Sequence, residues 1–434
     1  MKILFIQPSH YLSDGKVFKQ RRTLFSVLTM PTLASYTPGD HLLEIVDDYV
    51  EEIDYSKNYD LVALTSKTIQ AERMYGIADE FRRRGMKVVM GGMHVSALPD
   101  ESKKHCDAIV IGEAESTWPQ LVKDYEKGRL QRVYKCEKWH DLEGLPVPRY
   151  DLLKVKSKLS MISYQTTRGC PFHCDFCAVS NFYGYTFRFK PVDEVIEHIR
   201  YIKERYKPKR FFFSDDNITA NSKYAFELFE RLIPLKIKWS SQSDVFVTKK
   251  KGLLQLARRS GCTNLYLGIE SVNQLSLDSV GKSSNRVKNY EEVFHLLKKE
   301  GITFETGMIM GLDGDDNSVF IKTFQYVNKQ KVPYPTYSVL TPFPGTRIRE
   351  KLKSENRLLD TKWRSYDYWS VNFKPSRMSV EELGSGHRRL FKKTYSLPSI
   401  FRRCIFPPAP RLFHTLVINF YNFWKLLFGK QVWE

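Results

Sequence analysis

Three cysteines in the middle of the chain restrict its fold more than any other feature. Cys170, Cys174 and Cys177 follow the spacing C-x3-C-x2-C, which lets one loop present three thiolates together. Three thiolates can hold three irons of a [4Fe–4S] cluster, whose full ligation needs one cysteine more. No further cysteine stands nearby in the sequence, so one iron would stay open to a ligand from outside the protein. An open iron favours a site for chemistry over one for electron storage.

Two other uses of the cysteines fit less well. A zinc site needs a fourth ligand, and His173 is the one candidate inside the motif. Disulfides are not expected, because the remaining cysteines are scattered along the chain and indicate a reducing compartment. The spacing therefore favours the iron–sulfur interpretation.

The residues around the cysteines extend the pattern. Arg168 and Gly169 precede the first cysteine, and the aromatic Phe176 stands just before the last one. This stretch resembles the cluster motif of the radical S-adenosylmethionine (SAM) superfamily. The resemblance implies that SAM binds the open iron through its amino and carboxylate groups. It also implies that an electron, delivered by a donor such as flavodoxin or ferredoxin, cleaves SAM to a 5′-deoxyadenosyl radical.

Length and composition set broad limits. A chain of 434 residues suggests two or three domains. Hydrophobic residues make up 42% and charged residues 27% of the chain, which is typical of a globular protein and excludes a disordered one. The apolar run in residues 1–8 is too short for a signal peptide and is typical of a strand. We therefore expect a cytoplasmic protein.

The first part of the chain alternates between strand and helix patterns. Strands are predicted at 2–6, 42–47, 60–66, 87–94 and 108–115, and a helix at 69–85. This alternation predicts a doubly wound, Rossmann-like α/β domain, which binds ligands at the carboxyl ends of its strands. The small or polar residues at those ends are Thr65, Ser66, Gly91, Gly92, His94, Gly112 and Glu113.

Two segments of this domain carry a second resemblance. V-V-M-G-G-M-H-V-S at 88–96 and D-A-I-V-I-G-E-A-E at 107–115 resemble the cobalamin-binding domain that precedes the radical SAM domain in a large enzyme family. The resemblance implies that the residues just named bind cobalamin, with glycines that let the backbone approach the corrin ring and the nucleotide tail.

The chain departs from one form of that domain, which supplies a histidine to cobalt through D-x-H-x-x-G. His10 stands in the equivalent stretch, but the Asp that would orient it and the Gly are missing. Radical SAM members of the family generally lack the motif, so its absence leaves cobalamin binding open. We interpret His10 as a histidine at the edge of a loop.

A linker and a second domain follow. The stretch L-P-V-P-R-Y-D at 145–151 is polar and proline-bearing, as linkers are. Six strands are then predicted at 161–167, 210–214, 238–244, 264–271, 303–311 and 335–340, with helices between them. Six βα units are too few for a closed eight-stranded barrel and match the partial (β/α)6 barrel of radical SAM enzymes.

The expected architecture is an α/β chain in four segments. They are a cobalamin-binding domain at 1–140, a linker at 141–157, a radical SAM barrel at 158–345 and a mostly helical C-terminal cap at 346–434.

The resemblance also implies the contacts to SAM. An acid or amide after the second barrel strand would accept hydrogen bonds from the SAM ammonium group, and a carboxylate after the fourth would bind the ribose hydroxyls. The segment G-M-I-M-G-L-D-G-D at 307–315 resembles the part that packs against adenine. The candidates are Phe176, Asp215, Asp216, Asn217, Gln242, Glu270, Gly307 and Gly311. Without a cofactor, Asp and Asn at a strand end would serve as turn or helix caps.

The C-terminal segment is basic and apolar at once. The formal net charge is +19, and from residue 383 onward Glu434 is the sole acid. No nucleic-acid recognition module accompanies this charge, whereas large apolar residues do, which favours the inner surface of a membrane. Residues 362–373 are rich in aromatic side chains that could close over the barrel mouth. A basic helix is predicted at 387–395. An apolar one at 411–428 either lies in a membrane interface or packs on the barrel.

These features predict an enzyme that removes hydrogen from an unactivated carbon of a small hydrophobic molecule. The leading hypothesis is C-methyl transfer through methylcobalamin, with a second SAM consumed to restore the methyl group. An alternative keeps the radical without methyl transfer, as in oxidative cyclisation, ring contraction or carbon–carbon coupling. A non-catalytic cobalamin or iron–sulfur sensor is a third hypothesis, which the complete cluster motif disfavours.

Overall fold

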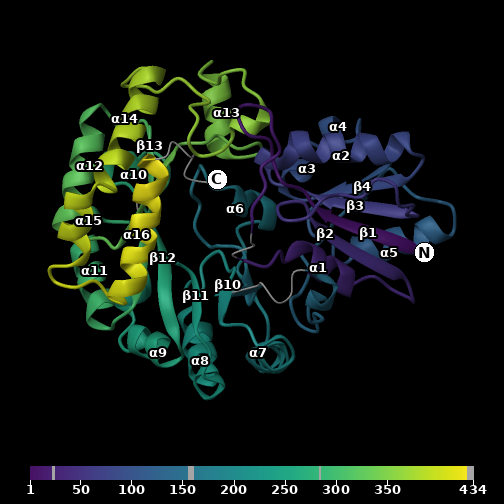
Figure 1. Cartoon of the computed structure of the whole chain (residues 1–434), viewed down its shortest axis with the longest axis horizontal. Helices are drawn as coiled ribbons and strands as arrows, with labels where there is room; N and C mark the ends of the chain where they lie inside the picture. Colours follow the sequence, from purple (N-terminus) through teal and green to yellow (C-terminus); the bar gives the residue numbers. More distant parts are fainter. Residues whose placement is uncertain (22–24, 155–160, 283–284, 428–434) are drawn as a thin grey trace.

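The structure is a computed structural model that describes residues 1–21, 25–154, 161–282 and 285–427. The last predicted linker residues (155–157), the first barrel residues (158–160) and the end of the cap (428–434) lie outside the described residues. Two lobes stand side by side: an N-terminal lobe, purple in Figure 1, and a teal-to-green barrel lobe that carries the yellow C-terminal helices.

The N-terminal lobe contains a six-stranded parallel sheet in the order β2-β1-β3-β4-β5-β6. Its strands are β1 (Lys2–Gln7), β2 (Leu42–Asp47), β3 (Leu61–Thr65), β4 (Lys87–Gly91), β5 (Ala108–Ile111) and β6 (Val133–Lys135). The chain order reverses between β1 and β3, which is the switch point where doubly wound sheets bind ligands. The predicted Rossmann-like arrangement is confirmed.

Both faces of this sheet are covered by helices, as Figure 1 shows. Along β1 the side chains alternate, so that Phe5 joins the core with Trp118 while Leu4 joins the core with Phe81 on the other face. The helices are α1 (Thr29–Ser35), α2 (Ala71–Arg83), α3 (Met93–Ala97), α4 (Pro99–Ser102) and α5 (Thr117–Glu126). Strand β6 was not predicted, because a three-residue strand with one buried side chain is too short to show a period.

The second lobe is the predicted open barrel. Its parallel sheet has the order β14-β13-β12-β11-β10-β7, so each strand pairs with its neighbours in the chain. The strands are β7 (Met161–Tyr164), β10 (Arg210–Phe213), β11 (Trp239–Ser243), β12 (Cys262–Glu270), β13 (Thr303–Met310) and β14 (Tyr334–Val339). The helices between them are α7 (Val192–Tyr206), α8 (Ser222–Leu232), α9 (Leu253–Arg259), α10 (Gln274–Asp278), α11 (Tyr290–Lys299) and α12 (Ser318–Lys329). A short hairpin, β8 (Thr167–Arg168) with β9 (Arg188–Phe189), follows β7 and encloses the cysteine loop and α6 (Ala178–Tyr183).

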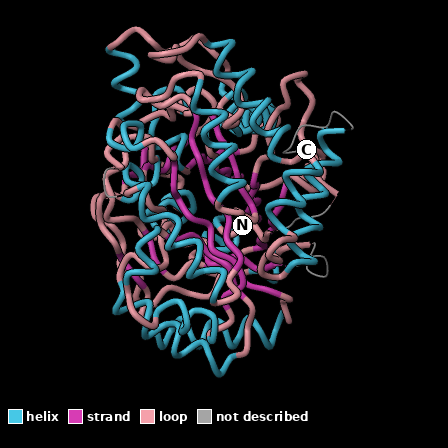
Figure 2. The backbone as a smooth tube through the Cα atoms, turned by 90° about the vertical axis from the view of Figure 1, so that its left-hand side faces the viewer, coloured by secondary structure: helices cyan, strands magenta, loops and turns pink. Residues whose placement is uncertain are grey.

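The C-terminal region is helical, as predicted. It comprises α13 (Arg347–Ser354), α14 (Val380–Thr394), α15 (Leu397–Cys404) and α16 (Leu412–Leu427). Helix α14 begins earlier than the predicted residue 387, because Ser379 and Glu382 form a capping box at its start. In Figure 1 α16 lies beside α15 and in front of the barrel strands, and Figure 2 shows helices packed around the magenta strands. Among the described residues no helix is both long and apolar enough to cross a membrane.

Candidate functional site

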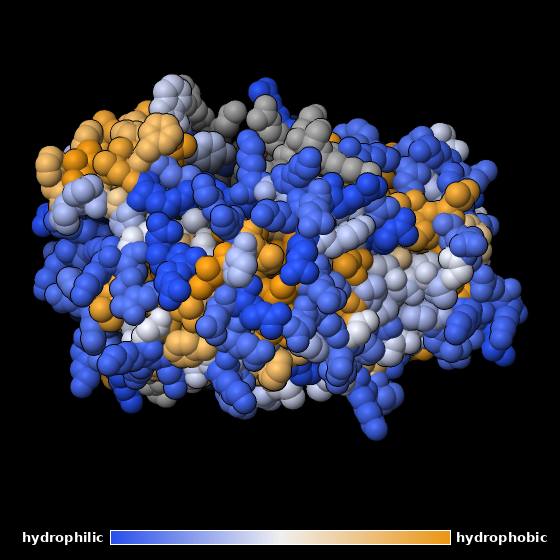
Figure 3. All heavy atoms as spheres, turned by 90° about the horizontal axis from the view of Figure 1, so that it is seen from below, coloured by the Kyte–Doolittle hydropathy of each residue, from blue (hydrophilic) through white to orange (hydrophobic). Residues whose placement is uncertain are grey.

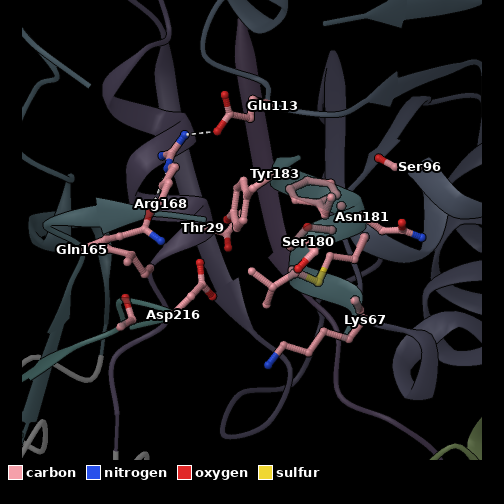
Figure 4. Close-up of a pocket in the computed structure, with 18 of the residues that line it drawn as sticks. Thr29, Lys67, Ser96, Glu113, Gln165, Arg168, Ser180, Asn181, Tyr183 and Asp216 are labelled. Carbon is pink, nitrogen blue, oxygen red and sulfur yellow. Dashed lines mark hydrogen bonds and ion pairs between the residues drawn. The ribbon is translucent and has the colours of Figure 1, made fainter. Parts of the chain in front are cut away.

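A large cavity lies between the two lobes. Its volume is ≈ 1260 Å³, and its walls come from the strand ends of the N-terminal sheet, the cysteine loop and the strand ends of the barrel. Figure 4 shows side chains of both lobes that point into it, including Ser96 from the N-terminal lobe and Asp216 from the barrel. The carboxyl ends of both parallel sheets therefore face one shared space, as expected for ligand sites in such sheets.

Cys170, Cys174 and Cys177 all line this cavity. The loop that carries them begins at Gly169, whose φ of 84° is in the left-handed region, and a Cβ at this position would stand 2.1 Å from the carbonyl oxygen of Thr186. A glycine is therefore required where the cysteine loop begins.

The far side of the loop is held by backbone hydrogen bonds of Asp175. Its N–H donates to the carbonyl of Val280 (3.1 Å), and its own carbonyl accepts from the N–H of Ile348 (3.0 Å). The loop is thus fixed to the barrel and to α13 independently of any cofactor.

The three thiols fit a multi-iron cluster. Among the described residues no group of three or more His, Cys, Asp or Glu side chains is arranged around a single metal ion. The three thiols share one loop at the cavity, and a [4Fe–4S] cluster would bind each thiolate to a different iron. Burial raises the pKa of all three thiols, so positive charge from iron would be needed to hold them as thiolates.

Six of the predicted SAM residues line the cavity. They are Phe176, Asp216, Asn217, Gln242, Glu270 and Gly307. Asp216 and Asn217 follow β10, and Glu270 ends β12, so they reach the cavity from two barrel strands that have β11 between them. This placement is compatible with the predicted contacts to SAM.

Two predicted SAM residues, Asp215 and Gly311, are not among the residues that line the cavity. The carboxylate of buried Asp215 accepts from the N–H groups of Thr166 (2.7 Å) and Thr167 (2.6 Å), so it holds the start of the β8–β9 hairpin. Gly311 faces the C-terminal region, where a Cβ would stand 2.6 Å from Leu383. Both residues shape the surroundings of the site and do not line it.

Lys282 also lines the cavity, although no sequence pattern predicts it there. Its Nζ lies 3.5 Å from Oε1 of Glu270, and the pair is almost enclosed. Burial would lower the pKa of Lys282, but the Glu270 carboxylate and the three cysteines more than offset this and raise it. A single lysine in a loop carries no recognisable signal, and only the folded chain places its charge beside the cysteines.

The predicted cobalamin residues form the opposite wall. Thr65, Ser66, Gly91, Gly92, Gly112 and Glu113 line the cavity. Gly92 has a φ of 99°, and a Cβ there would stand 2.6 Å from Oγ1 of Thr65, so the turn after β4 needs glycine. The bare backbone of these turns leaves room for a large flat ligand.

Two histidines lie away from this wall. His94 was predicted to bind cobalamin, but it is buried behind the turn, where its Nε2 lies 3.0 Å from the hydroxyl of Tyr75, and it does not line the cavity. His10 packs against Phe18 and meets the hydroxyl of Tyr49 at 3.3 Å, which agrees with its interpretation as a loop histidine.

Glu113 has a role that the sequence did not indicate. Its carboxylate accepts from Arg168 (3.0 Å) and from Arg188 (2.8 Å), and Arg168 also pairs with Glu115. The dashed line in Figure 4 marks the Arg168 contact. Because the acids follow β5 and the arginines belong to the β8–β9 hairpin, this buried network joins the two lobes at the cavity wall.

A second unpredicted lysine, Lys67, extends into the cavity from the N-terminal lobe (Figure 4). Its side chain is exposed in the cavity, and the protein atoms that surround it there lower its pKa by desolvation. No ion pair of Lys67 is found among the described residues. Lys67 thus gives the cavity a cation that could meet an anionic group of a ligand.

The aromatic segment 362–373, expected to close the barrel mouth, lies only partly at the cavity. Tyr368 lines the cavity together with Phe343. Trp363 and Arg364 reach the N-terminal lobe instead, where the indole N–H donates to Glu101 (2.8 Å) and the Arg364 backbone N–H donates to Glu72 (3.0 Å). The segment therefore bridges the lobes beside the cavity.

Family models match each part of the chain. The radical SAM superfamily matches residues 164–327, the B12 binding domain matches residues 37–122, and a domain of unknown function matches residues 346–406. These ranges agree with the cysteine-bearing barrel, the glycine-turn lobe and the helical C-terminal region.

Known proteins share this layout. Bacteriochlorophyllide d C-12(1)-methyltransferase of Chlorobaculum tepidum is 34% identical over 93% of this chain and 89% of its own length. The anaerobic magnesium-protoporphyrin IX monomethyl ester cyclase of Cereibacter sphaeroides is 24% identical over 92% of this chain and 71% of its own length. In structure, the radical SAM methyltransferase TsrM of Kitasatospora setae superposes with a TM-score of 0.67 over 82% of this chain and 76% of that one, at 14% identity. The chain therefore belongs to the family of cobalamin-dependent radical SAM enzymes, whose cofactors are a [4Fe–4S] cluster, SAM and cobalamin.

Proposed function

We propose that this enzyme transfers a methyl group to an unactivated carbon of a small hydrophobic molecule. The observation that carries the proposal is the single cavity, onto which the cysteine loop and the glycine turns of the N-terminal sheet both open. When bound, the cluster and SAM supply a 5′-deoxyadenosyl radical and methylcobalamin supplies the methyl group. A substrate held between the two walls would meet both.

The chain's own residues have the tasks of binding, orienting and excluding water. Asp216, Asn217 and Glu270 would orient SAM over the cysteine loop, and the turns at Gly92 and Gly112 would hold cobalamin opposite. The buried Glu113–Arg168 pair would keep the two walls at a constant separation. A reactive radical depends on such a closed and ordered site.

The cavity lining and the relatives support a proposal for the substrate class. Aromatic side chains such as Tyr266, Phe343 and Tyr368 offer flat apolar surface, and Lys67 offers a positive charge. A tetrapyrrole with a carboxylate fits both features, and bacteriochlorophyllide d is the compound named for the relative from Chlorobaculum tepidum. A donor such as flavodoxin or ferredoxin would supply the electron.

A second candidate function is radical oxidation or cyclisation without methyl transfer. It is favoured by the relatedness to the cyclase of Cereibacter sphaeroides, which spans most of this chain. The two functions differ in their SAM-derived products, so one assay separates them.

The test is anaerobic turnover of the reconstituted enzyme with SAM, hydroxocobalamin, a chemical reductant and bacteriochlorophyllide d. Methyl transfer predicts S-adenosylhomocysteine and 5′-deoxyadenosine in equal amounts, with a product heavier by one methylene. Product with 5′-deoxyadenosine alone would support cyclisation. The Cys174→Ala variant serves as control and should form no 5′-deoxyadenosine. If the wild type also forms none, the chain is a sensor and both functions are wrong.

A further inference from the structure

Helix α16 exposes an apolar face on the outside of the molecule. Its most exposed large side chains are apolar or aromatic: Phe413 (83% exposed), Val417 (52%), Tyr421 (57%), Trp424 (59%) and Leu427 (61%). Their spacing of four, four, three and three residues places them on one face of the helix. A surface helix in water normally turns such a face toward the core.

The opposite side of α16 packs Leu412, Leu416 and Phe423 near α15 and also carries buried polar side chains that are hydrogen-bonded to the barrel and to α15. The amide of Asn419 accepts from Nη2 of Arg403 (2.9 Å) and donates to the carbonyl of Pro333 (3.1 Å). Thr415 accepts from the hydroxyl of Tyr334 (3.0 Å) and is itself fully buried. These directional bonds set the rotation of the helix, so the apolar face is held outward by the fold.

The apolar surface continues beyond α16. Phe401 on α15 is 48% exposed, and Phe406, in the turn between the two helices, is 75% exposed. Figure 3 shows hydrophobic side chains gathered at the upper left corner of the view, over this end of the barrel lobe. Exposed apolar surface of this extent marks a site of contact with a partner or a membrane.

Arginines near the start of α16 indicate whether the exposed apolar surface contacts a protein partner or a membrane. Arg411 lies close enough to Arg210 and Arg258 for their charges to lower its pKa, after the larger effect of burial. Among the described residues none of the three forms an ion pair with a carboxylate. Arg210 begins β10, so this arginine cluster lies at the edge of the barrel opposite the cavity, beside the highly exposed Phe413.

We propose that α16 and the α15–α16 turn dock this enzyme on an anionic membrane surface, with the apolar face in the lipid interface and the arginine cluster against lipid phosphates. A helix parallel to the interface with aromatic anchors and flanking cations has the chemistry for this position. A second copy of the chain would cover the apolar face but would bring a second arginine cluster, whose charge repels the first. The inference does not depend on the proposed reaction, since membrane binding requires no turnover.

The test is flotation of the full-length holoenzyme with vesicles of phosphatidylcholine, with or without phosphatidylglycerol. We expect binding to the anionic vesicles that weakens with salt. The double variant F413S/W424S should lower the apparent affinity at least about tenfold, because two large side chains no longer enter the lipid. The variant R258Q/R411Q should lose the preference for anionic over neutral vesicles.

The matched control is L42S/L275S, which removes two apolar side chains that are 73% and 67% exposed elsewhere and should bind like the wild type. Unchanged thermal unfolding and iron content show that each variant is folded. Equal flotation of wild type and F413S/W424S would overturn the proposal, as would no flotation of the wild type. A wild-type dimer that F413S/W424S converts to a monomer, without any binding to vesicles, would assign the face to a second copy and overturn it also.

Discussion

Lys282 shows how much a single charge can matter at this site. The cysteine thiols lie in surroundings that raise their pKa, because burial disfavours the thiolate form. Lys282 places a cation beside them while its partner Glu270 also faces the cavity. The charge of the lysine therefore favours the thiolate form that a cluster would need.

Replacement of Cys170, Cys174 or Cys177 by alanine should abolish cluster binding, because each thiolate would hold a different iron. Iron and acid-labile sulfide per chain, measured after anaerobic reconstitution, should fall to the background. Cys136→Ala is the matched control, since Cys136 lines the same cavity but lies outside the loop. Full iron content in any of the three loop variants would contradict the assignment.

At the scale of elements, the hairpin β8–β9 and the loop after β5 depend on each other. The hairpin brings Arg168 and Arg188 to the acids Glu113 and Glu115, and all four side chains are largely buried. A buried charge without its partner costs far more than an exposed one. The two lobes are therefore expected to unfold together.

Glu113→Gln should lower the free energy of unfolding by about 3 kcal/mol, because it leaves Arg188 without an acid in a buried site. Chemical unfolding monitored by circular dichroism measures this. Asp193→Asn, which breaks the exposed Arg231–Asp193 pair, is the control and should cost at most about 1 kcal/mol. Similar losses in both variants would show that the buried network does not hold the lobes together.

The same network predicts a dependence on pH. Burial alone would raise the pKa of Glu113, but its hydrogen bond with Arg188 and the charges of both arginines hold it below the usual value. A lowered folded-state pKa contributes stability above the unfolded-state pKa of about 4.3, and this contribution is lost as pH falls through the folded-state value. The difference in stability between wild type and Glu113→Gln should therefore shrink in acid. A constant difference across that range would contradict this origin.

At the scale of the whole molecule, the cavity is a property of both lobes. Its walls come from two sheets that each present their carboxyl edge, and the Trp363–Arg364 segment returns from the barrel lobe to the first lobe. A ligand that fills the space contacts both lobes, so binding and overall stability are linked.

Hydroxocobalamin should raise the apparent free energy of unfolding, by about 2.7 kcal/mol at a free concentration one hundred times its dissociation constant. Thermal unfolding at increasing cobalamin concentrations measures the shift. NAD is the control ligand, because it binds other doubly wound domains and should cause no shift here. An unfolding temperature that does not respond to cobalamin would contradict its placement in this cavity.

Much of the fold could be predicted from local signals. Buried parallel strands appear as continuous apolar runs, and the cysteine spacing within one loop specifies a cluster without knowledge of the rest of the chain. Weak local signals were missed, such as β6, or misplaced, such as the start of α14. Contacts between segments that are distant in the sequence determine the positions of Lys282, Arg188 and His94. No periodic pattern in the sequence indicates such contacts.

The C-terminal helix shows most clearly what the sequence determines and what only the tertiary structure determines. Its sequence determined that residues 411–428 are apolar, basic at the start and helical, and it left open whether this helix lies in a membrane interface or packs on the barrel. Only the tertiary structure shows which side of the helix contacts the rest of the chain, because Arg403 and the carbonyl of Pro333 lie where they can bond Asn419. Those buried polar groups need partners, and supplying them turns Asn419 inward and leaves Phe413, Tyr421 and Trp424 facing outward.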